Sequence, residues 1–92
     1  MNTNRARRAA IEAILTANIT SLEVWQNRPY TAVKLTTKYD GLEYTEVGFA
    51  KAHWPDKWDA DFGIELATRK VIASISKAIV NGDGYKLTRC PF

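Results

Sequence analysis

Hydrophobic and polar positions follow two different periods along this 92-residue chain, and the change of period marks its predicted elements. Residues 3–18 carry hydrophobic side chains at a spacing of three and four, which predicts a helix with one buried face. The same spacing in residues 60–80 predicts a longer helix, whose main hydrophobic stripe should lie on the rest of the domain. This stripe consists of Ile64, Ala67, Val71, Ile72, Ile75, Ala78 and Ile79.

The region between the two helices alternates between hydrophobic and polar positions, as strands with one buried face do. Turn residues divide it twice. Asn27-Arg28-Pro29 interrupts the alternation, and Asp40-Gly41 supplies the positive φ angles of a tight hairpin. We therefore predict three antiparallel strands, with expected bounds of 19–26, 30–38 and 42–52.

The alternation in the first and third strands predicts which side chains share a side of the sheet. In the first strand, Leu22 and Val24 share one side and Trp25 lies on the other, as in a half-buried strand. In the third strand, Phe49 lies on one side, and Gly48 on the other indicates either a bulge or a point of close approach.

The predicted order of helix, three-stranded antiparallel sheet and helix defines an α+β protein, and residues 1–92 suit a single domain. The glycines of segment 81–84 should end the second helix, and we expect residues 85–92 to form either a short C-terminal strand or a tail. A domain this small buries a limited fraction of its surface, so a homodimer would be a natural source of additional stability.

The composition changes this picture only slightly. Thirteen Lys and Arg residues against ten Asp and Glu give a net charge of +3, which permits an acidic partner without requiring one. The single cysteine, Cys90, cannot form an internal disulfide. No segment approaches the ~18–20 apolar residues of a membrane-spanning helix, and Glu12 interrupts the only candidate signal-peptide core. We therefore expect a cytoplasmic protein with no membrane partner.

The sequence contains no arrangement typical of an active site. Its one histidine, His53, has no identifiable nucleophile or oxyanion donor beside it. Asp59, Asp61 and Glu65 alternate as in some calcium loops, but the distal bidentate glutamate is missing, and capping of the second helix explains them better. We therefore expect no enzymatic activity, no cofactor and no metal site.

Several large hydrophobic side chains are candidates for binding another protein. Trp54 and Trp58 flank one short turn, where they either close the end of the core or stand exposed as anchors. The second helix also carries a minor stripe on its back, which either the first helix or the C-terminal segment covers or a partner contacts. The protein-binding candidates are Trp25, Trp54, Trp58, Phe62 and Leu66.

Basic side chains are candidates for binding nucleic acid. Arg5, Arg7 and Arg8 lie in the first turns of the first helix, where the helix dipole disfavours cations, so they either lie in solvent or meet an anion. Lys34 and Lys38 lie on the predicted solvent side of the second strand.

Three short segments carry a resemblance to a known family. Residues 48–51, 55–57 and 63–70 read Gly-Phe-Ala-Lys, Pro-Asp-Lys and Gly-Ile-Glu-Leu-Ala-Thr-Arg-Lys. They resemble a small double-stranded-RNA-binding-like domain family of unknown function, whose members occur in actinobacteria and in phage and prophage genomes. The resemblance implies the α-β-β-β-α topology of double-stranded-RNA-binding domains. Those domains contact phosphate with lysines at the start of the second helix, where this chain has carboxylates that repel phosphate.

Two functional hypotheses follow from the resemblance and from the absence of catalytic residues. The first is a non-enzymatic, inhibitor-like binding module of phage or prophage type, which occupies a host or phage protein or a defence complex through its exposed aromatic side chains. The alternative is a nucleic-acid-binding protein that uses the N-terminal arginines and the strand lysines.

Overall fold

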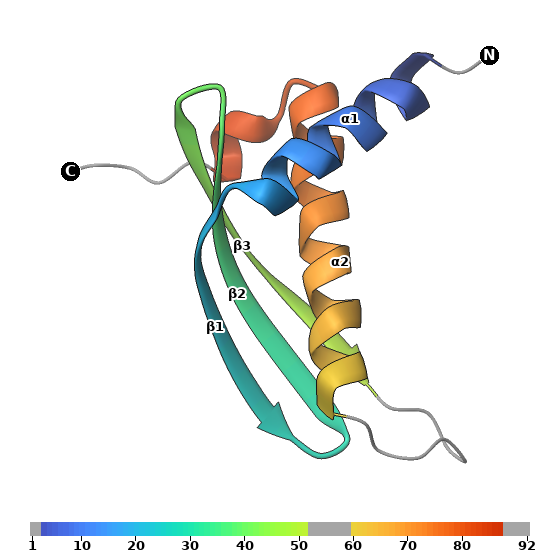
Figure 1. Ribbon diagram of the computed structural model, residues 1–92, viewed down its shortest axis with the longest axis vertical. Helices are drawn as coiled ribbons and strands as arrows, with labels where there is room; N and C mark the ends of the chain where they lie inside the picture. The colour runs from blue at the N-terminus through green and yellow to red at the C-terminus, as the bar shows by residue number, and fades with distance from the viewer. Residues whose placement is uncertain (1–2, 52–59, 88–92) are drawn as a thin grey trace.

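The computed structural model describes residues 3–51 and 60–87, and Figure 1 shows the arrangement of their elements. The order of helix, three strands and helix is the predicted one, so the α+β class and the α-β-β-β-α order are confirmed. A short 3-10 helix follows. The bounds are α1 Thr3–Ala17, β1 Ile19–Asn27, β2 Tyr30–Tyr39, β3 Leu42–Lys51, α2 Ala60–Val80 and η1 Gly84–Leu87.

The three strands form one antiparallel sheet in the order β1-β2-β3, with β2 in the centre. The β1–β2 connection is Arg28-Pro29, whose peptide bond is cis. The β2–β3 connection is the predicted hairpin, since Asp40 and Gly41 have φ angles of 53° and 79°. The β2–β3 register continues without a shift through Gly48, so this glycine does not form a bulge.

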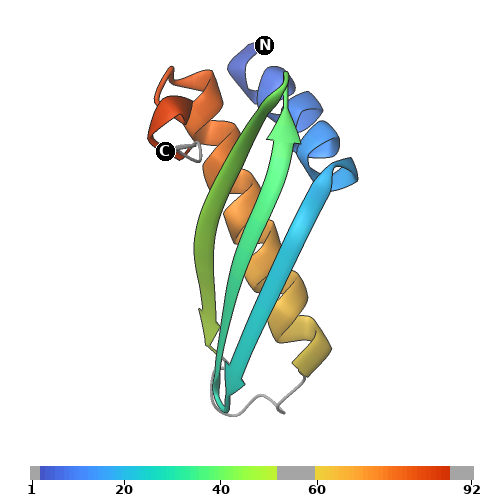
Figure 2. The same ribbon diagram turned by 90° about the vertical axis from the view of Figure 1, so that its left-hand side faces the viewer.

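Both helices lie on the same face of the sheet, which we call the inner face (Figures 1 and 2). The long helix α2 packs on β3 and β2, while α1 crosses one end of the domain and packs on α2 and β2. The opposite, outer face of the sheet faces the viewer in Figure 2, with no described element over it. The buried hydrophobic core lies between the sheet and the helices and consists of Ile11, Leu15, Val33, Leu35, Tyr44, Ala50, Ala67, Val71, Ile72 and Ile75.

Two glycines bring α2 close to the sheet. A Cβ atom added at Gly48 of β3 would lie 2.5 Å from Val71 Cγ2 and 2.8 Å from the carbonyl oxygen of Ala67. A Cβ atom added at Gly63 of α2 would lie 2.6 Å from Thr31 Oγ1 on β2. Gly48 therefore marks a point of close approach, which was one of the two predicted alternatives.

Two buried hydroxyl groups anchor α1. Ser76 of α2 donates a hydrogen bond to the carbonyl oxygen of Arg8 at 3.0 Å, and Thr37 of β2 donates one to the carbonyl oxygen of Leu15 at 2.6 Å. Both side chains are fully buried. The helix α1 therefore covers part of the back of α2, as one of the predicted alternatives required, whereas Phe62 at the other end of α2 stays exposed.

The C-terminal end of α2 is closed by the predicted glycine signal. Gly82 has a φ angle of 82°. Its amide donates a hydrogen bond to the carbonyl oxygen of Ile79, and the amide of Asp83 donates one to the carbonyl oxygen of Ala78. This pair of hydrogen bonds is a Schellman motif. Residues 84–87 form η1, so the predicted C-terminal strand is wrong over this segment, and residues 88–92 lie outside the described part.

The structure corrects two local expectations, on Asp61 and Thr36, and a third, on Asp59, lies outside the described residues. Asp61 lies inside the first turn of α2, so it cannot be the residue that precedes the helix as its cap, and Asp59 is outside the described residues. The alternation of β2 puts Thr36 on the same side as Lys34 and Lys38, which we expected to face solvent, yet Thr36 is buried there and its hydroxyl shares a 2.9 Å hydrogen bond with that of Thr45. Among the described helices, none is long and apolar enough to cross a membrane.

Substitution of Gly48 by alanine tests the close approach of α2. We expect Gly48→Ala to lower the free energy of unfolding by about 1–3 kcal/mol, because the new methyl group meets a side chain and a backbone oxygen of α2. Urea unfolding of the two proteins measures this difference. Val71→Ala in the Gly48→Ala background should restore only part of the loss, since the contact with the carbonyl oxygen of Ala67 remains. Equal stability of wild type and Gly48→Ala would contradict the close approach.

The buried ring of Tyr44 predicts a loss of stability at alkaline pH. Burial, followed by the nearby Asp40 and Tyr39, raises the pKa of Tyr44 above its ordinary value of about 10. The unfolded chain therefore releases this proton at lower pH than the folded protein does. The contribution of Tyr44 is complete below about pH 10 and is lost as the pH rises through the folded pKa.

Urea unfolding between about pH 9 and about pH 11 should show a steeper loss of stability in the wild type than in Tyr44→Phe. The phenylalanine variant keeps the buried ring and removes the titrating hydroxyl, so it serves as the matched control. Parallel pH profiles for the two proteins would contradict the raised pKa.

Candidate binding surface

The outer face of the sheet carries the largest exposed side chains of the strands. The register places Trp25, Ala32 and Phe49 in one row across β1, β2 and β3. Thr31, Val33 and Leu35 of β2 are buried on the inner face, so Ala32 and its two neighbours must point outward. Trp25 is 54% exposed and Phe49 is 66% exposed. We call these side chains, together with Tyr30 and Val47, the outer-face patch.

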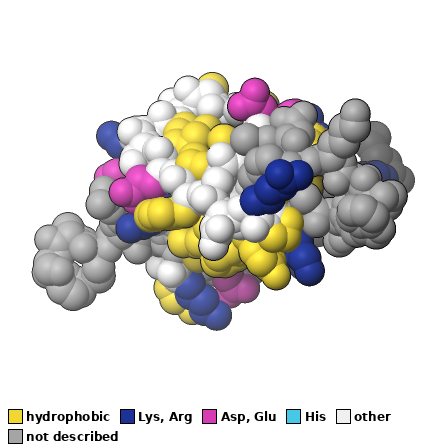
Figure 3. Space-filling model, turned by 90° about the horizontal axis from the view of Figure 1, so that it is seen from below, with side chains coloured by type: hydrophobic (Ala, Val, Ile, Leu, Met, Phe, Trp, Pro, Cys, Tyr) yellow, Lys and Arg dark blue, Asp and Glu magenta, His cyan; other side chains and the backbone are white. Residues whose placement is uncertain are grey.

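The outer-face patch is concentrated at the end of the sheet that holds the β1–β2 connection. A shallow hollow at this end is lined in part by Trp25, Tyr30, Ala32 and Phe49. Figure 3 views the molecule from below and shows hydrophobic side chains gathered there, with lysine or arginine beside them. The small side chain of Ala32, between two exposed rings, leaves room in which a side chain of another molecule can lie.

The charges of the outer face are largely paired across the strands. Lys34 Nζ lies 4.0 Å from Glu23 Oε2, and Lys38 is directly opposite Glu43 in the register. Lys51 Nζ lies 5.6 Å from the centre of the Tyr30 ring, a cation–π distance. Exposed ion pairs of this kind stabilise the fold little, but they leave the face without a strong excess of positive charge.

The predicted protein-binding residues that the structure describes, Trp25, Phe62 and Leu66, do not form one surface. Trp25 belongs to the outer face, whereas Phe62 and Leu66 lie on α2, on the other side of the sheet. Phe62 is exposed, and Leu66 is partly buried against the core. Trp54 and Trp58 lie outside the described residues. Of the three candidates that the structure describes, only Trp25 joins the outer-face patch.

The predicted nucleic-acid-binding residues are also divided between two surfaces. Arg5, Arg7 and Arg8 lie on α1, in the helical layer. Lys34 and Lys38 lie on the outer face of β2, on the opposite side of the sheet. A single phosphate backbone therefore cannot contact both groups on one continuous face of the described structure.

Sequence reasoning missed Phe49, Val47 and Tyr30 as binding candidates. The alternation in β3 placed Val47 and Phe49 on one side, but it could not tell which side the helix covers. The signal was Gly48, because a glycine needed for close approach of α2 puts Phe49, the next residue, on the uncovered face.

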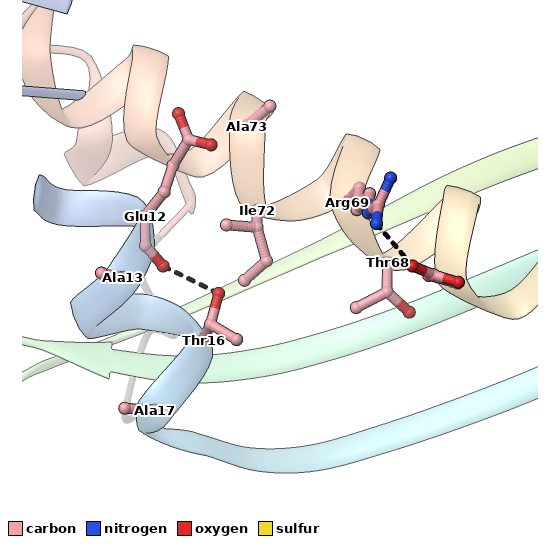
Figure 4. A pocket seen from close by; sticks show the side chains of 9 residues that line it. Glu12, Ala13, Thr16, Ala17, Thr68, Arg69, Ile72 and Ala73 are labelled. Atoms are coloured by element: carbon pink, nitrogen blue, oxygen red, sulfur yellow. Dashed lines mark hydrogen bonds and ion pairs between the residues drawn. The ribbon is translucent and has the colours of Figure 1, made fainter. Parts of the chain in front are cut away.

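A second concave region lies between α1 and α2 and has a volume of about 840 Å³ (Figure 4). Four of its five polar side chains, Thr16, Glu65, Thr68 and Arg69, have partners on their own helices. Arg69 pairs with Glu65, and the hydroxyls of Thr16 and Thr68 donate to the carbonyl oxygens of Glu12 and Ile64. We call this region the interhelical groove; it is lined by Glu12, Ala13, Thr16, Ala17, Glu65, Thr68, Arg69, Ile72 and Ala73.

The interhelical groove offers mainly apolar contact. Ile72 is the largest aliphatic side chain in its lining, and the alanines of α1 form much of the opposite wall. Within residues 3–51 and 60–87, no group of three or more His, Cys, Asp or Glu residues is close enough to hold a metal ion.

Comparison with known proteins adds no relative to this geometry. No protein-family model, no curated protein and no solved structure matches the chain. The outer-face patch is accordingly the candidate site, on the grounds of its exposure, its position on the rigid central sheet and its paired charges.

Proposed function

We propose that this protein is a non-enzymatic binding module whose outer-face patch contacts a protein partner. The observation that carries the proposal is the row of Trp25 and Phe49 on either side of Ala32. Both rings are more than half exposed although the sheet holds them in place. Aromatic side chains on a rigid scaffold lose little conformational entropy on binding and are enriched among the residues that dominate protein interfaces.

The balance of charge favours a protein over a nucleic acid. Binding to a phosphate backbone depends on lysines and arginines that release counterions. On the outer face, Lys34 pairs with Glu23, and Lys38 lies opposite Glu43. The arginines of α1 cannot add to this face because they lie in the helical layer. The arrangement suits a partner that has a projecting hydrophobic side chain surrounded by both signs of charge.

The resemblance to phage and prophage proteins supports a more specific form of the proposal. The partner would be a host or phage protein, or a defence complex, and the module would act by occupying the surface that this partner needs. Such a mode of action requires no reacting group, only a surface that excludes water and competing ligands. The cytoplasm is the corresponding location.

A photo-crosslinking residue at Ala32 would identify the partner, and calorimetry with the purified partner would then measure the contribution of each ring. We expect Trp25→Ala and Phe49→Ala each to weaken binding at least about 30-fold, which corresponds to the ~2 kcal/mol of an interface hot spot. Phe62→Ala is the matched control, because Phe62 is a similarly exposed aromatic residue, at 58%, away from the outer face.

Two outcomes would contradict the proposal. In the first, both aromatic variants bind the crosslinked partner as tightly as the wild type does. In the second, a gel-shift assay shows binding of single-stranded or duplex probes at low salt, with Trp25→Ala abolishing the shift. That result would assign the outer face to nucleic acid, because exposed rings can also stack on unpaired bases.

A further inference from the structure

We propose that the free edge of β1 pairs with β1 of a second copy of this chain. The two strands would run antiparallel about a two-fold axis and join the sheets into one six-stranded sheet. The interface would consist of the edge of β1, the inner-face side chains Leu22 and Val24, and the adjacent interhelical groove. It does not depend on the proposed function, which uses the outer face.

The first observation is the exposure of β1. Eight of its nine residues are exposed, and β2 is its one neighbouring strand in the sheet. The strand contains no proline and no lysine, and its only charged residue is Glu23. Edge strands normally carry charges, prolines or bulges that prevent pairing with another chain. The register of β1 on β2 shifts between Ile19 and Ser21, and the regular edge from Ser21 to Asn27, with so little protection, can accept another strand.

The opposite edge of the sheet provides the contrast. The edge strand β3 carries Glu43, Glu46 and Lys51, and η1 packs against it. From α2, Lys70 Nζ donates a hydrogen bond to the carbonyl oxygen of Phe49 at 3.1 Å. One edge is therefore protected by charge and by neighbouring elements, and the other is open.

The second observation is the position of the helical layer. The helix α2 packs on β2 and β3, so the inner-face side chains of β1 are left without full cover. Leu22 is 44% exposed and Val24 is 37% exposed, although both point toward the helical side. The interhelical groove lies on this helical side of the sheet, and Figure 4 shows β1 passing below it. A second copy would bring its own Leu22 and Val24 against these side chains.

An antiparallel self-pairing of β1 can avoid contact between like charges, because Glu23 is the only charged residue of the strand. Residues that face each other must lie on the same side of the sheet, and a register centred on Val24 satisfies this requirement. It places Trp25 rather than Glu23 opposite the second copy's Glu23, which avoids a pair of like charges. It also brings the exposed Arg28 of the second copy toward the C-terminal end of α1.

That end of α1 favours a cation. The last turn of α1 contains no basic residue, so the negative end of its dipole has no compensating charge from its own sequence. Arg28 is exposed, at the tip of the β1–β2 connection. The symmetry repeats this contact on the other side of the axis, so one register combines strand pairing, apolar contact and the approach of Arg28 to the end of α1.

Sedimentation equilibrium tests the pairing. We expect the wild type to sediment as a dimer of twice its 10.4 kDa mass, and Leu22→Lys and Val24→Lys each to sediment as a monomer with an unchanged circular dichroism spectrum. Val47→Lys is the matched control, since Val47 is also 44% exposed but lies on the outer face. This variant should remain a dimer.

A monomeric wild type at about 100 μM would overturn the inference, as would a dimer that both lysine variants leave intact. A crosslink tests the register directly. In a Cys90→Ser background, Val24→Cys should form a disulfide-linked dimer on oxidation. Failure of the dimer and failure of the proposed function can be told apart. If the dimer does not form, partner binding by Trp25→Ala and Phe49→Ala can still be measured. If no partner binds the outer face, the sedimentation result is unaffected.

Discussion

The close contact between α2 and the central and third strands is the constraint on which the rest of this fold depends. Gly48 and Gly63 provide it from the two sides, one on the sheet and one on the helix. Larger side chains at these positions would push α2 away from the sheet and open the core. Because β2 and β3 supply the close contacts, α2 is held over these two strands and away from β1.

Two uncovered surfaces follow from that placement. The inner face of β1 receives little cover from α2, and α1, which Ser76 and Thr37 anchor by hydrogen bonds, covers only one end of the domain. With both helices on the inner face, the outer face is left to its own side chains. The exposed rings and the free edge are therefore consequences of one packing arrangement, and each suits contact with another macromolecule.

Local signals in the sequence were sufficient for the elements themselves. The bounds of α2 follow from its hydrophobic period, the β2–β3 hairpin from Asp40-Gly41, and the end of α2 from Gly82, because each depends on residues close together in the chain. The surfaces depend on contacts between distant segments. The pattern of β1 predicted a half-buried strand, yet Leu22 is largely exposed because α2 lies elsewhere. Likewise, no local pattern could show that the arginines of α1 and the lysines of β2 lie on different sides.

The two uncovered surfaces would act together in a dimer. A two-fold axis perpendicular to the joined sheet leaves both outer faces on the same side, so the rows of Trp25 and Phe49 from the two copies would form one extended face. A partner that is itself two-fold symmetric could contact both rows at once. The second contact would then be intramolecular, which raises the overall affinity without any additional interaction in either row. Pairing through the edge of β1 would in this way raise the affinity of the outer-face patch for its partner.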